Sequence, residues 1–425
     1  MRLIAGGMLL VLSLAAAAGG TETPVTALRC ASAIDVVHGA RIDHAVLLIR
    51  GGRIVGIGPN LPIPSGAKTI DLGDATVLPG LIDAHTHLLL RFEGRLGDEE
   101  TNMIVALNTV EPSGRALLGA AMAREMLEAG FTSVRDLGNS GRHGDVALRD
   151  AIRQGWVPGP RMIVSTRALA GPGGQFSRLA ALGRELAREE YVEIAGADSA
   201  RRAVREAVFD GASVIKAIAD GTVNLSLGEL EAIVDEAHRA GLKVAAHATG
   251  DEAARTAARA GVDSIEHAYS APDDVLRVMA EKKIFLVPTD FPPDAGVGSP
   301  EQIAAERKRL ARALELGVPI AAGSDAYYAQ PGRTRGESAK LMFRAYAAAG
   351  MTPARILRAA TIDAARLLGL DGQVGSLEVG KYADLLVVGG DPLTDVKSLD
   401  QVRAVMKAGV IVGGQPGGFS PAPRP

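Results

Sequence analysis

The segment VLPGLIDAHTHL, from Val77 to Leu88, decides the fold that we predict for this chain. Its apolar run from Val77 to Ile82 is typical of a buried strand, and His85 and His87 follow that run. Residues two apart on a strand point to the same face, so these two imidazoles can bind one metal ion from one side. An isolated His-x-His pair is more often structural, so the prediction depends on what the rest of the chain adds.

The bulk composition describes a balanced soluble protein. The chain has 425 residues, of which 47% are apolar and 22% are charged, with a formal net charge of -3. This length allows two or three domains, or one barrel that takes up most of the chain. A chain without excess positive charge offers no general attraction to a polyanion, so we expect no nucleic-acid partner.

The first twenty residues have the order of a secretory signal peptide. Arg2 precedes a short apolar run from Met8 to Ala18 that ends in small residues. We therefore expect residues 1–20 to be removed on export to the periplasm or the medium, and no membrane association afterwards. A membrane anchor or an ordinary buried helix is the alternative, although the run is short for a permanent span. Cys30 is the only cysteine, so no intrachain disulfide is possible.

Short strand-like runs with turn residues occur at both ends of the chain. Residues 21–75 contain several such runs, and Gly51 with Gly52 is typical of a hairpin turn. Residues 370–414 have a similar texture. Because neither end has enough strands for a sheet of its own, we predict that both form one small β-sandwich domain. The Pro- and Gly-rich residues 415–425 are expected to be a disordered tail.

Between these ends the hydrophobic period changes. Residues 76–369 contain eight strand-like runs, each followed by a helical or loop segment. The runs are ATVLPGLIDAH, FTSVRDLG, RMIVSTRALAG, SVIKAIADG, LKVAAHATG, VDSIEHAYS, IFLVPTD and VPIAAGSDA. Strands that alternate with helices favour a parallel sheet, and eight such units predict an α/β fold with a closed (β/α)8 TIM barrel.

The ends of these runs carry residues that bind metals. The six candidates are His85, His87, Lys216, His247, His267 and Asp325. In a (β/α)8 barrel the carboxyl ends of all strands meet at one mouth, where the active site lies. Eight histidines placed by chance would scatter over helices and loops, as His238 does. We therefore predict one metal centre.

The motifs PGLIDAHTHL, VIKAIADG, VAAHATG, SIEHAYS and AAGSDA, with GSLEVGKYADLLVVGGDP near the C-terminus, resemble those of the amidohydrolase superfamily. The branch that is most similar contains imidazolonepropionase-like and prolidase-like enzymes, with dipeptidases, carboxypeptidases and ochratoxin amidases among its members. The resemblance implies a homo-oligomer and two divalent metal ions. It implies that His85, His87 and Asp325 hold one ion and that His247 and His267 hold the other. A carboxylated Lys216 would bridge them.

Physical chemistry supports the assignment of Lys216. An ammonium buried in an apolar strand is costly, so this lysine is expected to lose its proton or to find anionic partners. A neutral amine can add carbon dioxide, and the resulting carbamate offers oxygens that divalent ions accept. The alternative is an ammonium that reaches the barrel rim or pairs with Asp220. Zinc is the first choice of metal, with manganese or cobalt as alternatives.

The expected reaction is hydrolysis of an amide bond in a small molecule. A hydroxide shared by the two ions would attack the carbonyl, and Asp325 would pass its proton to the leaving amine. The family resemblance suggests a dipeptide or N-acyl amino acid that loses its C-terminal residue. Candidate substrate contacts in the loops after the strands are Arg135, His143, Gln175, Asn224, Tyr269 and Tyr327, with Tyr328 beside the last. Arg135 can instead form an internal ion pair with Asp136.

The exact substrate and the reaction class have alternatives. Many relatives have a histidine where this chain has Gln175 in GPGGQF, which leaves the exact substrate open. A cyclic amide, an imidazolone or another ester-like substrate is the main alternative, whereas deamination is disfavoured because no glutamate follows His247 by three residues. A barrel that has lost its chemistry and only binds partners is the remote alternative, since such a protein should have lost metal ligands.

Overall fold

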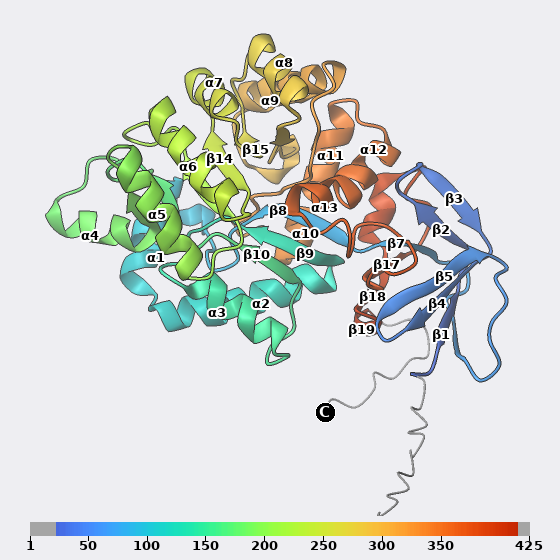
Figure 1. The fold of residues 1–425 in the computed structure, drawn as a ribbon. Helices are drawn as coiled ribbons and strands as arrows, with labels where there is room; N and C mark the ends of the chain where they lie inside the picture. The colour runs from blue at the N-terminus through green and yellow to red at the C-terminus, as the bar shows by residue number, and fades with distance from the viewer. Residues whose placement is uncertain (1–22, 415–425) are drawn as a thin grey trace, which may run out of the picture.

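The computed structural model describes residues 23–414 of the chain. The expected signal peptide (1–20) and the expected tail (415–425) lie outside the described residues. Within them, a larger part with alternating strands and helices lies beside a smaller part made of strands (Figure 1). The protein is therefore an α/β structure with a small additional β region. In the described part of the chain, no helix is both long enough and apolar enough to cross a membrane.

The small β region contains two sheets. A four-stranded sheet has the order β5 (Arg53–Pro59), β4 (Ala45–Arg50), β1 (Thr26–Arg29), β6 (Lys68–Asp71). A six-stranded sheet has the order β19 (Val410–Gly413), β18 (Val402–Lys407), β17 (Leu385–Val388), β7 (Thr76–Pro79), β2 (Ser32–Asp35), β3 (Ala40–Asp43). Strand β17 pairs with β7 in antiparallel register, so the blue and red ends of the chain share one sheet (Figure 1).

Two observations explain why the strands fold together. Leu47, Ile54, Val77 and Leu385, which come from both ends of the chain, pack in one buried cluster. The turn between β4 and β5 needs glycine at position 52, where φ is 76° and an added Cβ would lie 2.6 Å from the backbone oxygen of Ala408. The chain can therefore reverse tightly while the C-terminal hairpin packs against the turn.

The larger part contains two parallel sheets. Three strands have the order β10 (Arg161–Val164), β9 (Phe131–Asp136), β8 (Leu81–Thr86). Six have the order β12 (Tyr191–Glu193), β11 (Ala168–Ala170), β13 (Ile215–Ile218), β14 (Val244–Ala248), β15 (Ser264–His267), β16 (Phe285–Val287). Backbone hydrogen bonds join the sheets at both sides: Ser213 N donates to Val164 O at 2.8 Å, and Ala84 N donates to Ala322 O at 2.8 Å.

Two of the expected strands differ from the prediction. The run RMIVSTRALAG is divided into β10 and β11, because Thr166 between them has a φ of 61°. The run VPIAAGSDA is not a regular strand: Ile320 alone forms a bridge, to Leu286, and Asp325 has a φ of 53°. Pro319 has no N–H for a ladder, which is one reason for the irregularity. The run nevertheless lies between β16 and β8, where Ala321 N donates to Leu286 O at 3.1 Å.

Helices surround the two parallel sheets. They are α1 (Glu99–Thr109), α2 (Pro112–Glu128), α3 (Gly144–Arg153), α4 (Ala181–Glu190), α5 (Ala197–Phe209), α6 (Leu227–Arg239), α7 (Asp251–Ala260), α8 (Asp273–Lys282), α9 (Pro300–Glu315), α10 (Arg335–Ala339), α11 (Leu341–Ala348), α12 (Pro353–Ala359) and α13 (Ile362–Leu368). Short 3-10 helices cover Gly94–Leu96, Pro293–Ala295 and Val396–Asp400. Ser226 and Glu229 form a capping box that begins α6.

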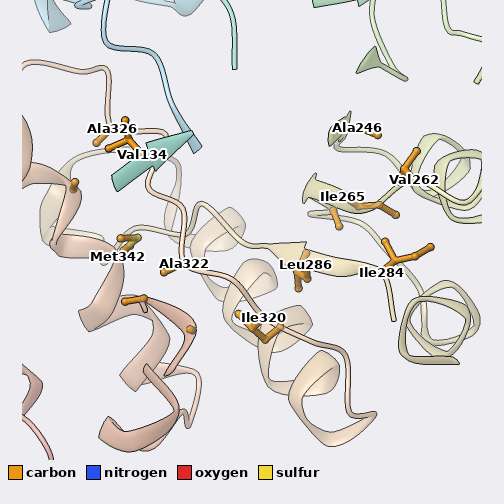
Figure 2. Packing of buried hydrophobic residues seen from close by; sticks show 14 of the residues in the cluster. Val134, Ala246, Val262, Ile265, Ile284, Leu286, Ile320, Ala322, Ala326 and Met342 are labelled. Atoms are coloured by element: carbon orange, nitrogen blue, oxygen red, sulfur yellow. The ribbon is translucent and has the colours of Figure 1, made fainter. Parts of the chain in front are cut away.

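One large hydrophobic core joins strands and helices. Figure 2 shows part of it, with Ile265 of β15, Leu286 of β16 and Ile320 among the buried side chains. Helix α7 contributes only alanines to its buried face, which lets it lie close to the sheet. Packed helices therefore cover one face of the strands that carry the candidate ligands, and the other face of these strands points to the interior between the sheets.

Candidate metal-dependent active site

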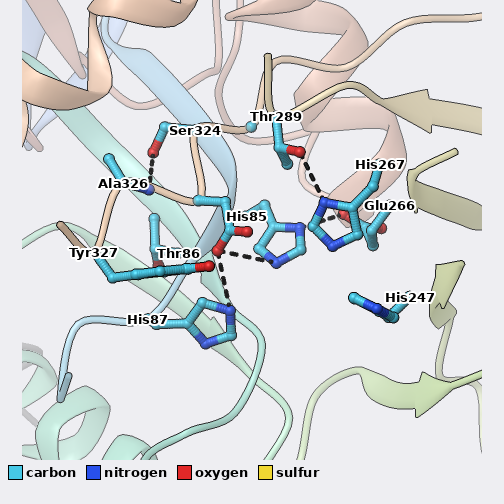
Figure 3. Close-up of polar contacts among 12 residues, drawn as sticks. His85, Thr86, His87, His247, Glu266, His267, Thr289, Ser324, Ala326 and Tyr327 are labelled. Atoms are coloured by element: carbon cyan, nitrogen blue, oxygen red, sulfur yellow. Dashed lines mark hydrogen bonds and ion pairs between the residues drawn. The ribbon is translucent and has the colours of Figure 1, made fainter. Parts of the chain in front are cut away.

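Three candidate ligands converge where β8 ends. His85 is the last residue but one of that strand, and His87 follows the strand (Figure 3). Asp325 contacts both from the irregular segment beside β8. Asp325 Oδ1 lies 3.3 Å from His87 Nε2 and 3.6 Å from His85 Nε2. One ligand atom from each residue falls within 4.8 Å of the others. This spacing allows all three side chains to bind the same ion.

Asp83 connects the two segments that carry these residues. Its carboxylate accepts hydrogen bonds from His85 N at 3.1 Å, Ser324 N at 2.9 Å and Ser324 Oγ at 2.6 Å. The side chain is fully buried, and burial raises the pKa of Asp83 to about 6. The aspartate therefore fixes the position of Asp325 relative to β8 through the neighbouring serine.

Hydrogen bonds to Nδ1 orient three of the histidines. His85 Nδ1 lies 2.8 Å from Glu266 Oε2, His87 Nδ1 lies 2.9 Å from Gly138 O, and His267 Nδ1 lies 2.8 Å from Thr289 Oγ1. The carboxylate and the carbonyl can only accept, which assigns the proton of His85 and His87 to Nδ1. Their Nε2 lone pairs then point toward Asp325, in the arrangement that orients metal-binding histidines.

A second group of ligand candidates lies beside the first. Lys216 on β13, His247 on β14 and His267 on β15 stand on neighbouring strands. The ring centroid of His267 lies 5.1 Å from that of His85 and 4.6 Å from that of His247 (Figure 3). The six candidates therefore surround one space.

The protonation states of His85 and His267 fit cation binding, whereas burial is outweighed at His87 by the carboxylate of Asp325, which raises the pKa of that imidazole. Burial lowers the pKa of His85 and of His267 well below its ordinary value, which keeps both imidazoles neutral as metal ligands must be. Burial also lowers the pKa of Lys216 to about 8, with Glu266 and Asp325 opposing the shift. Asp325 Oδ1 is buried and has no hydrogen-bond donor among the described residues. Imidazole nitrogens beside an unpartnered carboxylate oxygen form a donor set that suits a divalent ion.

The site opens into a cavity of about 130 Å³. Its walls include the apolar side chains Leu90, Phe92, Met103, Leu137 and Ile218. Of the expected substrate contacts, Gln175, Tyr269 and Tyr327 also line it. Tyr328 packs its ring 5.4 Å from Phe92, behind the wall. The cavity thus combines the metal-binding candidates with an apolar surface that can contact a small molecule.

Arg135 lies in the interior and not on the cavity wall. Its side chain is 1% exposed, and it donates to Ala84 O at 2.6 Å, Ser264 Oγ at 3.0 Å and Glu266 Oε1 at 2.8 Å. It therefore pairs with Glu266 and not with Asp136, and it does not line the cavity. Three of the five N–H donors of Arg135 are thus bound in the interior, away from the cavity.

His143 and Asn224 are also absent from the cavity wall. Asn224 is exposed on the loop after β13. His143 lines a different, wider surface hollow of about 480 Å³ together with Arg142 and Arg205. Arg142 and Arg205 already pair with Glu189 and Glu236, and Arg167 and Arg202 also line the hollow. Substrate contact by either residue stays a prediction.

Sequence reasoning did not find Glu99, Glu266 and Thr289, although all three serve the site. Glu266 adjoins His267, and the alternation of a strand would send one of the two away from the metals. His267 has a φ of 70°, which breaks the alternation and lets both residues serve. Glu99 lies at the start of α1, far in the sequence from any strand end. The hydroxyl of Tyr327 donates a hydrogen bond to Glu99, and both side chains line the cavity. Only Glu266 left a signal in the sequence, as a polar residue next to a candidate ligand.

The fold and this donor set are those of metal-dependent hydrolases. The chain matches the Amidohydrolase family over residues 76–412, and it belongs to that family. It is therefore a hydrolase that acts on C–N bonds.

Individual relatives are similar over most of the chain. Ochratoxinase of Aspergillus niger is 32% identical over 413 residues, which cover 86% of this chain and 82% of that protein. Imidazolonepropionase of Symbiobacterium thermophilum is 31% identical over 390 residues, which cover 82% of this chain and 84% of that protein. A crystal structure of a Xaa-Pro dipeptidase with bound methionine superposes with a TM-score of 0.79 at 28% identity and covers 91% of this chain and 99% of that one.

Proposed function

We propose that the protein is a binuclear metal-dependent amidase that cleaves a dipeptide or a similar small amide and releases its C-terminal residue. His85, His87 and Asp325 would hold one divalent ion, and His247 and His267 the other. A carboxylated Lys216 would bridge the two. The observation that carries the proposal is the oriented set of imidazoles around the unpartnered oxygen of Asp325. The two parallel sheets, closed by the segment that carries Asp325, would act as one (β/α)8 barrel.

Different residues of the site have different roles in the proposed reaction. Bound divalent ions, of which zinc is our first choice, supply a Lewis acid and lower the pKa of water. Asp325 accepts the proton of the attacking water and returns it to the leaving nitrogen, because its free oxygen faces the same space as the histidines. The apolar walls reduce the water around the scissile bond, which strengthens electrostatic interactions there.

The relatives support hydrolysis of amides and leave two substrate classes. A Xaa-Pro dipeptidase shares the fold at 28% identity, which supports a linear amide. The similarity to imidazolonepropionase supports a cyclic amide as the second candidate. Export from the cell and assembly into a homo-oligomer stay predictions.

The test is product release from a pooled panel of dipeptides, aminoacyl amides, N-acyl amino acids and cyclic amides, followed by mass spectrometry. We expect cleavage of a linear amide that is lost on chelation and restored by zinc, manganese or cobalt. Asp325→Asn should abolish it, whereas His238→Gln should not, since His238 pairs with Asp263 on the outer face of α6. No amide cleavage by protein that holds two metal ions per chain would overturn the proposal, and cleavage of cyclic amides alone would select the second candidate.

A further inference from the structure

The tyrosine beside His267 presents a hydrogen-bond acceptor to the cavity. Thr289 Oγ1 lies 2.7 Å from Pro288 O. Because a carbonyl oxygen can only accept, the threonine hydroxyl donates its one proton to this oxygen. The hydroxyl of Tyr269 lies 2.9 Å from the same Thr289 oxygen. Tyr269 must therefore donate its proton to Thr289. What remains for a ligand is the lone pairs of the phenol oxygen.

Tyr327 and Glu99 present acceptors in the same way. The hydroxyl of Tyr327 donates to Glu99 Oε1 at 2.5 Å. Burial raises the pKa of the Glu99 carboxyl, and a bound ammonium would lower it again by favouring the charged form. Both side chains line the cavity, and no lysine, arginine or histidine forms an ion pair with Glu99 in the described part of the chain. The second carboxylate oxygen of Glu99 therefore remains available to a ligand that carries protons.

The other polar groups of the wall leave few donors. Tyr191 donates to Gln175 Oε1 at 3.0 Å, and Thr249 donates to Asp220 Oδ2 at 2.7 Å. No arginine lines the cavity, and Lys216 is its only lysine among the described residues. The amide nitrogens of Gln175 and Asn139 are the donors left: the first lies 3.3 Å from His247 Nε2, and the second donates to Met103 Sδ at 3.8 Å. Apart from the metal-binding candidates, a substrate carboxylate would thus contact mainly oxygen acceptors, among them the carboxylate of Glu99.

From this distribution of hydrogen-bond donors and acceptors we propose that the enzyme recognises a protonated amine on the acyl half of its substrate, with Glu99 as the specificity-determining residue. The proposal rests on the proposed amidase function. The ammonium would donate to Glu99 and to the lone pairs of Tyr327, while Leu90, Phe92 and Met103 contact the apolar part of the substrate. Aminoacyl amides and dipeptides with a free amino group are the substrates that fit. N-acylated amino acids lack the cation and do not fit.

The position of Glu99 favours an α-amino group. Tyr327, which binds Glu99, is two residues from Asp325, and its ring centroid lies 5.9 Å from that of His87. The cation would therefore lie close to the scissile carbonyl, and an α-ammonium is separated from that carbonyl by one carbon atom. An amine at the end of a side chain has the same chemistry at a greater distance, so the two sources can be separated by experiment.

The test compares three anilides: L-leucine anilide, N-acetyl-L-leucine anilide and 6-aminohexanoic acid anilide. We expect kcat/KM for the first to exceed that for the acetylated compound by about tenfold or more, as expected for one charge-assisted hydrogen bond. Glu99→Gln should raise KM for leucine anilide by a similar factor and leave the acetylated compound unaffected. Glu100→Gln is the matched control, because Glu100 lies on the same turn and binds Ser177 instead.

The outcomes separate this proposal from the amidase function. Equal rates for the free and acetylated anilides, or a Glu99→Gln enzyme with unchanged KM, would overturn the recognition of an ammonium while cleavage itself stands. Preference for the 6-aminohexanoic anilide would assign the amine to a side chain. Calorimetric binding of L-leucinamide against N-acetyl-L-leucinamide gives a readout that needs no turnover. If the metal-loaded protein cleaves no amide, selective binding of L-leucinamide that Glu99→Gln abolishes would still support the site, and its absence would overturn it.

Discussion

The hydroxyl of Thr289 is predicted to decide how firmly His267 binds a metal ion. The side chain is 3% exposed, and its Oγ1 makes contacts to His267 Nδ1 at 2.8 Å, Tyr269 Oη at 2.9 Å and Pro288 O at 2.7 Å. Thr289→Val keeps the branched shape and the left-handed backbone with its φ of 59°, and it removes only this hydroxyl. The change therefore isolates the hydrogen bonds from packing and strain.

The magnitude follows from the number of partners that are lost. His267 and Tyr269 each keep a donor without an acceptor, and each unsatisfied buried donor costs about 1–3 kcal/mol, or about 2–6 kcal/mol of unfolding free energy together. Loss of an outer-shell partner of a metal-binding histidine typically weakens metal affinity about 10–100-fold. We expect Thr289→Val to lie in both ranges.

The assay is metal content after dialysis against a graded chelator, combined with thermal unfolding of the metal-free protein. Thr289→Ser is the matched control, because it keeps the hydroxyl and should retain most of the affinity. Thr289→Val protein that binds two ions as tightly as the unchanged protein would refute the role of Thr289. The same result would refute His267 as a ligand if His267→Ala also left the metal content unchanged.

Three further results are expected. Lys216→Met should remove the added mass of one carbon dioxide in native mass spectrometry and lower the metal content, and a variant that keeps both ions would contradict the bridging role. Arg135→Met should lower the unfolding free energy by about 3–5 kcal/mol, because it leaves Glu266 as an unpaired buried charge, and KM should not change; a raised KM at full stability would restore Arg135 as a substrate contact. Burial, followed by the charge of Asp290, raises the pKa of Glu306 to about 7 from an ordinary 4.5, so the folded protein keeps a proton that the unfolded chain releases. Protonated Glu306 therefore stabilises the folded protein, and this contribution is lost as the pH rises from about 4.5 to about 7. Thermal unfolding of Glu306→Gln should show a flatter pH dependence. A profile identical to that of the unchanged protein would contradict this role of Glu306.

Much of the arrangement of secondary structure could be predicted from periodicity. The helical or loop segments expected between the strand-like runs include Leu230 and Leu310, and the structure places these residues in helices α6 and α9, because an amphipathic face must be buried whatever the tertiary detail. The division between β10 and β11 could not be predicted, since the sequence around Thr166 carries neither glycine nor proline to mark the break. The irregular segment around Asp325 was equally hidden in a run of apolar residues.

The candidate ligands could be read from the sequence, but their orienting partners could not. His85 is held by Glu266, 181 residues away in the sequence, and Tyr327 by Glu99, at a separation of 228. Neither pairing leaves a local pattern. Arg135 shows the converse: its position near the end of a strand suggested a role at the cavity, whereas it donates to Glu266 and Ser264 in the interior.

The sequence by itself determined the family, the alternation of strands and helices, and the residue types at the strand ends, because each depends on local spacing and on which atoms a side chain carries. The tertiary structure decided which nitrogen of each histidine is free and to which acceptor each hydroxyl donates its proton. It also decided which charged groups reach the cavity. These properties depend on hydrogen bonds between distant segments, and a donor with a single proton is committed only once the fold has brought its acceptor within reach.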